Sequence, residues 1–333
     1  MLQFMRASKF PKALLAFAAV SWVASAAAQT GASRYPDKPI RIIVPVGAGG
    51  STDVITRIVT ERLAAKLGQT IIVDNKPGAG GIVGTELAAK AAPDGYTLLM
   101  GYAAFALSPH LVKTVAYDPR TFVPISQVAT QAIAIAAHPS FAPRTPREIV
   151  DWTKANPGKL NVGISTTGSS GHVAFEQLRL QTGLDAQGVI YKSAAANMTA
   201  VLSSEVPMSF VSVSGALPFQ KSGQLRIVAT LTDKRTPQTP NVPTFNESGV
   251  PGVSKLVSTG WTGLLAPPGT PKPIVDRVYA ALVEVLAEPA IIAKLEVVGV
   301  NVLGSSPAEF AKEIEAESIE FKTVVERSGM KMR

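Results

Sequence analysis

The feature that most constrains this chain is a repeated order of short apolar runs, glycine turns and helical segments near its start. Residues 40–44 are apolar and rich in β-branched side chains, which is typical of a buried strand. A glycine turn at 47–51 follows, and apolar residues then recur at helical spacing from Val54 to Leu67. The order returns with a strand at 71–73 and a glycine turn at 77–81. Such alternation favours right-handed crossovers and a parallel sheet covered by helices.

The rest of the chain continues this alternation, and its 333 residues are enough for two domains with separate cores. Two capping boxes, which begin at Thr145 and Ser306, predict helix starts. The predicted fold class is therefore α/β. We expect further strands near residues 96–100, 128–137, 161–165, 188–191, 206–213, 226–230 and 261–266, and helices near residues 172–181, 195–203 and 274–286.

The composition excludes several classes of protein. With 46% hydrophobic and 17% charged residues, the chain is too apolar to be described as intrinsically disordered. It has no cysteine, which excludes a disulfide framework, a thiolate metal site and a cysteine nucleophile. Three histidines, His110, His138 and His172, leave little for metal chemistry. We therefore expect no cofactor and no metal.

The first 28 residues have the pattern of a secretory signal peptide. Basic residues precede an uncharged stretch from Ala13 to Ala28, which ends on three alanines. The alternative is an uncleaved membrane anchor, but the stretch is shorter than the roughly 20 residues that span a bilayer. We expect export to the periplasm, cleavage near Ala28 and a soluble mature protein.

The charge of the chain argues against nucleic acid as a partner. The net charge is +8, and it falls to +5 without the leader. The remaining basic residues are scattered and form no Lys/Arg-rich run. The sequence therefore predicts a mildly basic protein that does not bind nucleic acid.

The first glycine turn predicts an anion site. The segment 47–52 lacks the third glycine of a dinucleotide fingerprint and the Gly-Lys pair of a phosphate loop. A helix that begins at Ser51 or Thr52 nevertheless presents free amides and the positive end of its dipole. Asp53 either compensates that dipole or caps the helix, and its negative charge would oppose an anionic ligand. We expect it to orient the loop.

A second loop, at residues 165–172, repeats the arrangement between a strand and a helix. Its hydroxyls and amides are suited to hold a carboxylate, although an ordinary capped loop has the same composition. His172 has no obvious partner residue, so a structural hydrogen bond is the default interpretation.

No catalytic set emerges from the sequence. Ser169 and Ser170 lack the nucleophile elbow of hydrolases, and neither a carboxylate pair nor a zinc-binding His-Glu-x-x-His motif stands out. Carboxylate pairs can be distant in sequence, so a secreted hydrolase or lyase remains the alternative to a binding protein.

Eight segments, spread over nearly the whole chain after Tyr35, occur in an order that is typical of one family. They are YPDKPIR (35–41), PVGAGGSTD (45–53), NKPGAGG (75–81), PDGY (93–96), GSSGH (168–172), YK (191–192), VPTF (242–245) and WTGLLAPPG (261–269). In this order they resemble the extracytoplasmic solute receptors of tripartite tricarboxylate transporters, also called Bug receptors.

The resemblance implies a two-lobed periplasmic-binding-protein fold of type II character, with the ligand in a cleft between lobes that close about a hinge. Lobe 1 would comprise residues 29–131 and 257–333, and lobe 2 residues 132–256. It implies a receptor and no enzyme, whose ligand is a small carboxylate. The partners would be membrane transporter subunits or, for a signalling adaptor, a sensor protein, and we expect a monomer.

The resemblance also implies which residues bind the ligand, by position in the loops that follow the strands. The expected ligand-binding residues are Val46, Gly50, Ser51, Thr52, Asp53, Tyr102, Ala103, Phe105, Thr167, Gly168, Ser169, Ser170, His172, Lys192, Ser193, Ala194 and Ser212.

Departures from the family pattern indicate the kind of carboxylate. The hydroxyl-rich loop after the third strand is replaced by residues 101–106, and the segment 207–212 carries no acid to accept an ammonium group. Ser193 stands where the family often has glycine. We expect a carboxylate without an amino group, whose apolar or aromatic body contacts Tyr102 and Phe105. The alternative is that these two rings pack beneath the loop.

Overall fold

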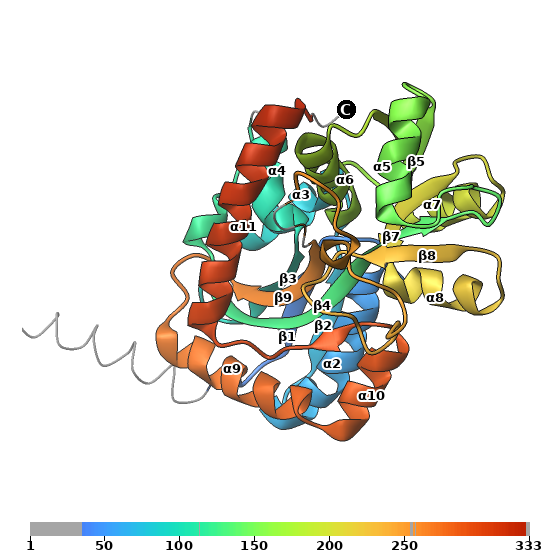
Figure 1. Ribbon diagram of the computed structural model, residues 1–333. Helices are drawn as coiled ribbons and strands as arrows, with labels where there is room; N and C mark the ends of the chain where they lie inside the picture. The colour runs from blue at the N-terminus through green and yellow to red at the C-terminus, as the bar shows by residue number, and fades with distance from the viewer. Residues whose placement is uncertain (1–34, 113, 254–255, 257, 331–333) are drawn as a thin grey trace, which may run out of the picture.

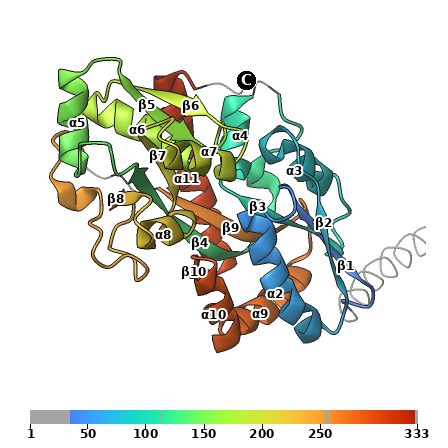
Figure 2. The same cartoon turned by 90° about the vertical axis from the view of Figure 1, so that its right-hand side faces the viewer.

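The protein is an α/β structure in which one curved sheet carries helices on both faces (Figures 1 and 2). The computed structural model describes residues 35–112, 114–253, 256 and 258–330. The strands are β1 (Ile40–Val44), β2 (Ile71–Asn75), β3 (Thr97–Tyr102), β4 (Val123–Ala137), β5 (Leu160–Ile164), β6 (Ala186–Ile190), β7 (Met208–Ser212), β8 (Arg226–Thr230), β9 (Thr259–Ala266) and β10 (Asn301–Val302). The helices are α2 (Ser51–Leu67), α3 (Ile82–Ala89), α4 (Ala104–Leu111), α5 (Pro146–Ala155), α6 (Ser170–Thr182), α7 (Ala194–Leu202), α8 (Val213–Lys221), α9 (Lys272–Leu286), α10 (Pro289–Val297) and α11 (Pro307–Ser328).

The long strand β4 divides the sheet into two parts. From Val123 to Ala132 it pairs with β9, and β10 joins its other edge. From Ile133 to Ala137 it pairs instead with β7 and β8. We call β1, β2, β3, β9, β10 and the first part of β4 sub-sheet A, and β5 to β8 with the end of β4 sub-sheet B. The strand order is β2-β1-β3-β9-β4-β7-β5-β6.

The central strands of each sub-sheet are buried on both faces. In β1, Ile42 packs against residues of α2 and α9, whereas its neighbour Ile43 packs with residues of α3, α4 and α11 on the opposite face. In sub-sheet B, Val162 and Phe210 pack with Phe175 of α6. A strand that is covered on both faces has no solvent side, which explains why these strands are continuous apolar runs.

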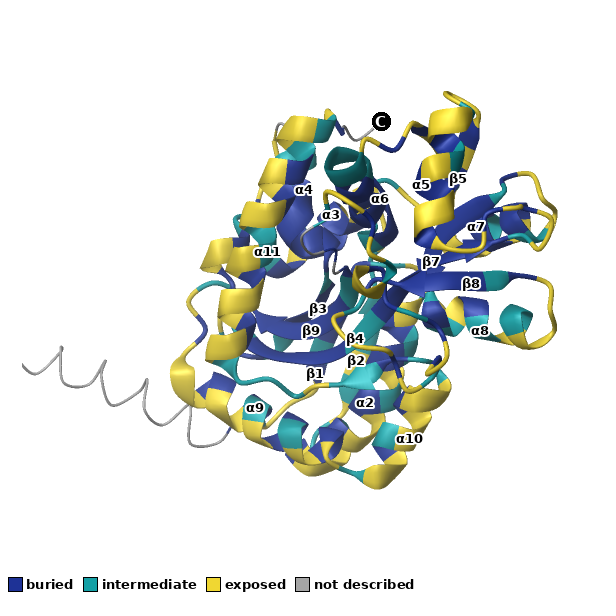
Figure 3. Ribbon diagram, viewed as in Figure 1, coloured by how far each residue is buried: buried dark blue, intermediate teal, exposed yellow. Residues whose placement is uncertain are grey.

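Exposed residues mark the outer faces of α5, α9 and α11 (Figure 3), whereas α4 and α6 are buried over most of their length. Both predicted capping residues are at helix starts. Thr145 Oγ1 accepts a hydrogen bond from Glu148 N, and Ser306 with Glu309 forms a complete capping box. The caps fix where these helices begin.

Two helices that the sequence analysis did not predict, α4 and α8, each contain a proline. Pro109 lies in the last turn of α4 and Pro218 in the second half of α8. Proline is usually a helix breaker, which hides such short helices from a pattern analysis. Both helices directly follow strands, and therefore begin near the cavity described below.

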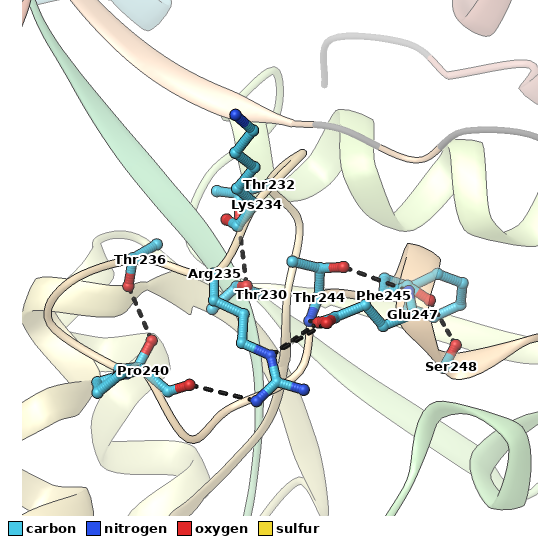
Figure 4. Close-up of polar contacts among 11 residues, drawn as sticks. Thr230, Thr232, Lys234, Arg235, Thr236, Pro240, Thr244, Phe245, Glu247 and Ser248 are labelled. Atoms are coloured by element: carbon cyan, nitrogen blue, oxygen red, sulfur yellow. Dashed lines mark hydrogen bonds and ion pairs between the residues drawn. The ribbon is translucent and has the colours of Figure 1, made fainter.

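The proline-rich segment after β8 is fixed to the edge of sub-sheet B (Figure 4). Thr244 forms a parallel bridge with Thr230, and its N–H donates to Glu247. Arg235 Nε lies 3.0 Å from Glu247 Oε2, and the ring of Phe245 is buried in the core of sub-sheet B. Polar and apolar contacts therefore hold the segment as it returns toward β9.

The predicted leader at residues 1–28, with its cleavage near Ala28, lies outside the described residues. Within the described part of the chain, no helix has both the length and the apolar character needed to cross a bilayer.

Candidate functional site

A cavity of about 990 Å³ lies where the two sub-sheets meet. The loops that follow β1, β3, β5, β6 and β7 all contribute to its lining. The carboxyl ends of parallel strands and the first turns of the following helices share one edge of a sheet, where open α/β folds bind ligands. Ser51 and Ser169, from the two glycine loops, both line this cavity.

The first loop is braced from behind by Asp53. Its Oδ2 accepts a hydrogen bond of 2.8 Å from Gly49 N, and its Oδ1 accepts one of 2.9 Å from Asn75 Nδ2. Arg57 Nε lies 3.0 Å from Oδ2. Burial alone would raise the pKa of Asp53, but these hydrogen bonds outweigh it and hold the pKa below its usual value. Asp53 is therefore a carboxylate that shapes the loop and does not line the cavity.

Because Asp53 holds the loop from behind, the start of α2 is open to the cavity. The residue before α2 is Gly50, which has no side chain to cap the helix. The first N–H groups of an α-helix have no acceptor within the helix. The amides of Ser51 and Thr52, at the positive end of a helix of 17 residues, therefore meet the cavity as hydrogen-bond donors.

The second loop is organised by Ser169 and His172. Ser169 Oγ accepts a hydrogen bond of 3.2 Å from His172 N and caps α6. His172 Nδ1 accepts one of 3.1 Å from Gly168 N. Burial lowers the pKa of His172 to about 4, so the ring is neutral at pH 7 and its Nδ1 lone pair is available. His172 thus shapes the loop from behind, outside the lining.

Two further helix starts border the cavity. Ser193 caps α7 through Ala196 N, and Ser212 caps α8 through Gly215 N. Lys192, directly before the α7 cap, is exposed and belongs to the lining. The starts of α2, α6, α7 and α8 therefore surround one hollow, and their dipoles favour a negative charge inside it.

The glycine turn that follows β2, at residues 77–81, positions Tyr102. The Tyr102 hydroxyl donates to Gly80 O at 2.8 Å, and a Cβ on Gly81 would lie 2.9 Å from the Tyr102 hydroxyl oxygen. Gly81 also has a φ of +95°, so both its conformation and the available space require glycine. Burial raises the pKa of Tyr102 to about 12, so the hydroxyl stays protonated.

Phe105 corrects the sequence-based expectation of a ligand contact. Residues 104–111 form α4, whose turn directs this ring toward Tyr117, Phe122 and Trp261. The side chain is 2% exposed and belongs to the core of sub-sheet A. Phe105 therefore packs beneath the loop, as the alternative interpretation had it. Tyr102, in contrast, lines the cavity.

The predicted site residues therefore separate into two groups. Asp53, Phe105 and His172 lie outside the lining, because all three side chains turn into the protein behind their loops. The remaining expected residues border the cavity: Val46, Gly50, Ser51, Thr52, Tyr102, Ala103, Thr167, Gly168, Ser169, Ser170, Lys192, Ser193, Ala194 and Ser212.

Gln131, which was not among the predicted site residues, lies where β4 passes between the sub-sheets. Its Nε2 donates to Ser214 Oγ at 2.9 Å, and its Oε1 lies 3.5 Å from Ser51 Oγ. It thus connects the start of α2 with the start of α8. The only sequence signal was a polar side chain in a mainly apolar extended run. Trp261, which also lines the cavity and donates its indole N–H to Glu317, was missed as a site residue as well.

The lining favours an anion over a cation. Among the described residues that line the cavity, Lys192 is the only charged side chain. The part of the chain that the structure describes also contains no group of three or more His, Cys, Asp or Glu side chains arranged to hold a metal ion.

Comparison with known proteins identifies the family. Residues 55–330 match the model of the tripartite tricarboxylate transporter family receptor. The chain belongs to this family. The predicted resemblance is thereby confirmed, and the family is one of solute receptors.

Solved structures confirm the fold class. The periplasmic binding protein BugD is 31% identical, with a TM-score of 0.77 over 90% of this chain and 100% of its own. An R. palustris protein with adipate is 28% identical, with a TM-score of 0.79 over 89% of this chain and 99% of its own. MatC from Rhodopseudomonas palustris with bound malate is 30% identical, with a TM-score of 0.75 over 87% of this chain and 100% of its own. The receptor described here has the two-lobed fold of these proteins.

Proposed function

We propose that this receptor captures a small organic carboxylate between its lobes in the periplasm and presents it to a membrane transporter. The observation that carries the proposal is the meeting of two helix starts, those of α2 and α6, in one cavity. Each offers main-chain N–H groups that hold a carboxylate without a buried arginine.

The strand pairing supports a hinge between the lobes. The boundaries proposed are residues 29–131 and 257–333 for lobe 1, and 132–256 for lobe 2. β4 changes partners between Ala132 and Ile133, close to the first boundary, and β9 begins at Thr259, close to the second. Two crossing segments of this kind permit closure about a ligand, which then contributes contacts only in the closed state.

The chemistry of the lining supports a ligand that has a carboxylate and no amino group. The described lining offers hydroxyls, amides and Lys192, and no carboxylate side chain to accept an ammonium group. Relatives with adipate and with malate carry acids of this kind. The same lining lacks a histidine or carboxylate to move protons, which supports binding without turnover.

The proposal extends to location and partners. The signal-peptide pattern at residues 1–28 supports export, and membership in a transporter receptor family supports delivery to membrane subunits. We propose that the receptor acts as a monomer. Presentation of the loaded receptor to a sensor protein would use the same ligand-dependent closure.

The test is titration calorimetry of the purified receptor with adipate, malate and the corresponding amides. We expect the acids to bind and the uncharged amides not to bind, because the helix starts select a negative charge. Ser51→Asp should weaken acid binding about 300-fold, the effect of two like charges about 5 Å apart at an effective dielectric constant of about 20. NMR of the recovered ligand should show it unchanged.

Ser140→Asp is the matched control, since it adds the same charge to an exposed loop outside the lining. It should bind acids as the parent protein does. Mass spectrometry of small molecules released on denaturation adds an independent readout of the natural ligand. Failure of every carboxylate to bind, or chemical conversion of the ligand, would contradict the proposal.

A further inference from the structure

We propose that an apolar subsite between α7 and α8 receives a hydrocarbon or aryl body of the ligand, so that the ligand is an amphiphilic monocarboxylate. This inference rests on the proposed function, because the subsite is part of the same cavity. Its walls are Met198 and Leu202 of α7, Val211 of β7 and Phe219 of α8.

One face of α7 is directed to the cavity. Ala195, Met198, Thr199 and Leu202 belong to the lining, and this spacing of three and four residues is one side of a helix. Thr199 Oγ1 donates to Ala195 O at 3.1 Å, so its hydroxyl is already satisfied. Asn197 also belongs to the lining, but it is buried and its side-chain amide is hydrogen-bonded to Ser209 Oγ and Phe210 O. Past the Ser193 cap, α7 therefore offers mainly hydrocarbon to the cavity.

α8 supplies the opposite wall. Gly215 and Phe219, four residues apart, both line the cavity. A Cβ on Gly215 would lie 3.8 Å from Met198 Cε, so the two helices approach closely. Met198 and Val211 are buried in one cluster, against which Leu202 and Phe219 pack while remaining partly exposed. A ligand body placed here would cover apolar surface that water now contacts.

The donors at the starts of α7 and α8 lie away from the apolar walls. The cap residues Ser193 and Ser212 and the cation of Lys192 lie at the starts of α7 and α8, and Leu202 and Phe219 lie toward the other ends of these helices. A second carboxylate at the apolar walls would lose its hydration without a donor in return, which is strongly unfavourable. A methyl or phenyl group would gain by burial instead.

The test is calorimetry with butanoate, hexanoate and octanoate, and with adipate, which replaces the terminal methyl group of hexanoate by a carboxylate. We expect affinity to rise along the series by about fourfold for each added methylene group that the subsite buries. Hexanoate should bind at least about tenfold more tightly than adipate. 4-Phenylbutanoate should bind more tightly than butanoate.

Substitutions in the walls of the subsite test whether these side chains contact the hydrocarbon body of the ligand. Leu202→Asn and Met198→Gln, which keep side-chain size, should weaken octanoate binding about tenfold and leave butanoate within about twofold. Leu87→Asn is the matched control, because Leu87 is a partly exposed leucine on α3 outside the lining. It should leave the whole series unchanged. Thermal unfolding of each variant checks that the fold is retained.

The outcomes separate this inference from the proposed function. Tighter binding of adipate than of hexanoate, reduced by Lys192→Ala, would overturn the apolar subsite while carboxylate capture stands. Affinity that does not change along the series would overturn it too. If no carboxylate binds and Ser51→Asp has no effect, the proposed function and the subsite fail together.

Discussion

The two glycine loops of the cavity have the same geometry and different chemistry. In the first, Gly49 has a φ of +80° and donates its N–H to the side chain of Asp53, four residues later. In the second, Gly168 has a φ of +78° and donates its N–H to the ring of His172, also four residues later. Each loop is therefore held by a buried acceptor in the first turn of its own helix.

The difference lies in what supports each acceptor. Asp53 is charged, and Arg57 on α2 and Asn75 at the end of β2 stabilise its charge. His172 is neutral and buried, and Ser169 caps the same helix with a hydroxyl that is also part of the cavity lining. The first loop is thus braced by a polar network behind it, whereas the second depends on local caps. Loss of one group should therefore affect the two loops unequally.

The largest expected effect is on stability when each acceptor is removed. Asp53→Ala breaks hydrogen bonds to Gly49, Asn75 and Arg57, and should lower the free energy of unfolding by about 3 kcal/mol. His172→Ala breaks one hydrogen bond and should cost about 1–2 kcal/mol. Urea unfolding at pH 7.5 measures both. Equal losses in the two variants would show that the hydrogen bonds of Asp53 with Asn75 and Arg57 do not contribute to the free energy of unfolding.

The second expected effect is that the contributions of His172 and Asp53 to stability are lost at different pH values. The pKa of His172 is about 4 in the folded protein and about 6.5 when unfolded, because burial disfavours the charged ring. Between these values the unfolded state binds a proton that the folded state does not, so stability falls as the pH falls from 6.5 to 4. The loss is at most about 3 kcal/mol. The contribution of Asp53, whose pKa is lowered, is lost only below its usual value of 3.8.

The control for this pH effect is His172→Asn, which keeps an acceptor for Gly168 N and does not titrate. Unfolding of the parent and the variant is compared at pH 7.5 and pH 4.5. The parent should lose stability relative to the variant at the lower pH. A constant difference between the two proteins would show that His172 is not buried in its neutral form.

The smallest expected effect is a difference in stability between two serine variants, which distinguishes a helix cap from a ligand contact. Ser169→Ala removes the α6 cap and should cost about 1 kcal/mol of stability, whereas Ser51→Ala removes no cap and should cost less than about 0.5 kcal/mol. Both should weaken carboxylate binding, because both hydroxyls line the cavity. Thermal unfolding and calorimetry on the same samples measure the two quantities. Loss of stability without loss of binding in Ser169→Ala would remove that hydroxyl from the site.

Much of the fold could be predicted because it depends on local patterns. Apolar runs such as residues 40–44 mark strands that are covered on both faces. Thr145 and Ser306 mark helix starts because each side chain accepts a hydrogen bond from a residue only three positions later. The helices α4 and α8 were missed because their prolines look like breakers, although neighbouring helices and strands pack against them.

The sequence by itself determined the strand–loop–helix units and the two loops that hold donors. Only the tertiary structure decided which helix starts share one cavity, since that depends on how β4 passes from one sub-sheet to the other. It also decided that Phe105 and His172 face inward while Tyr102 faces the cavity. The physical reason is that a side chain's direction depends on how its helix or strand packs against residues distant in the chain, which neighbouring residues in the sequence do not specify.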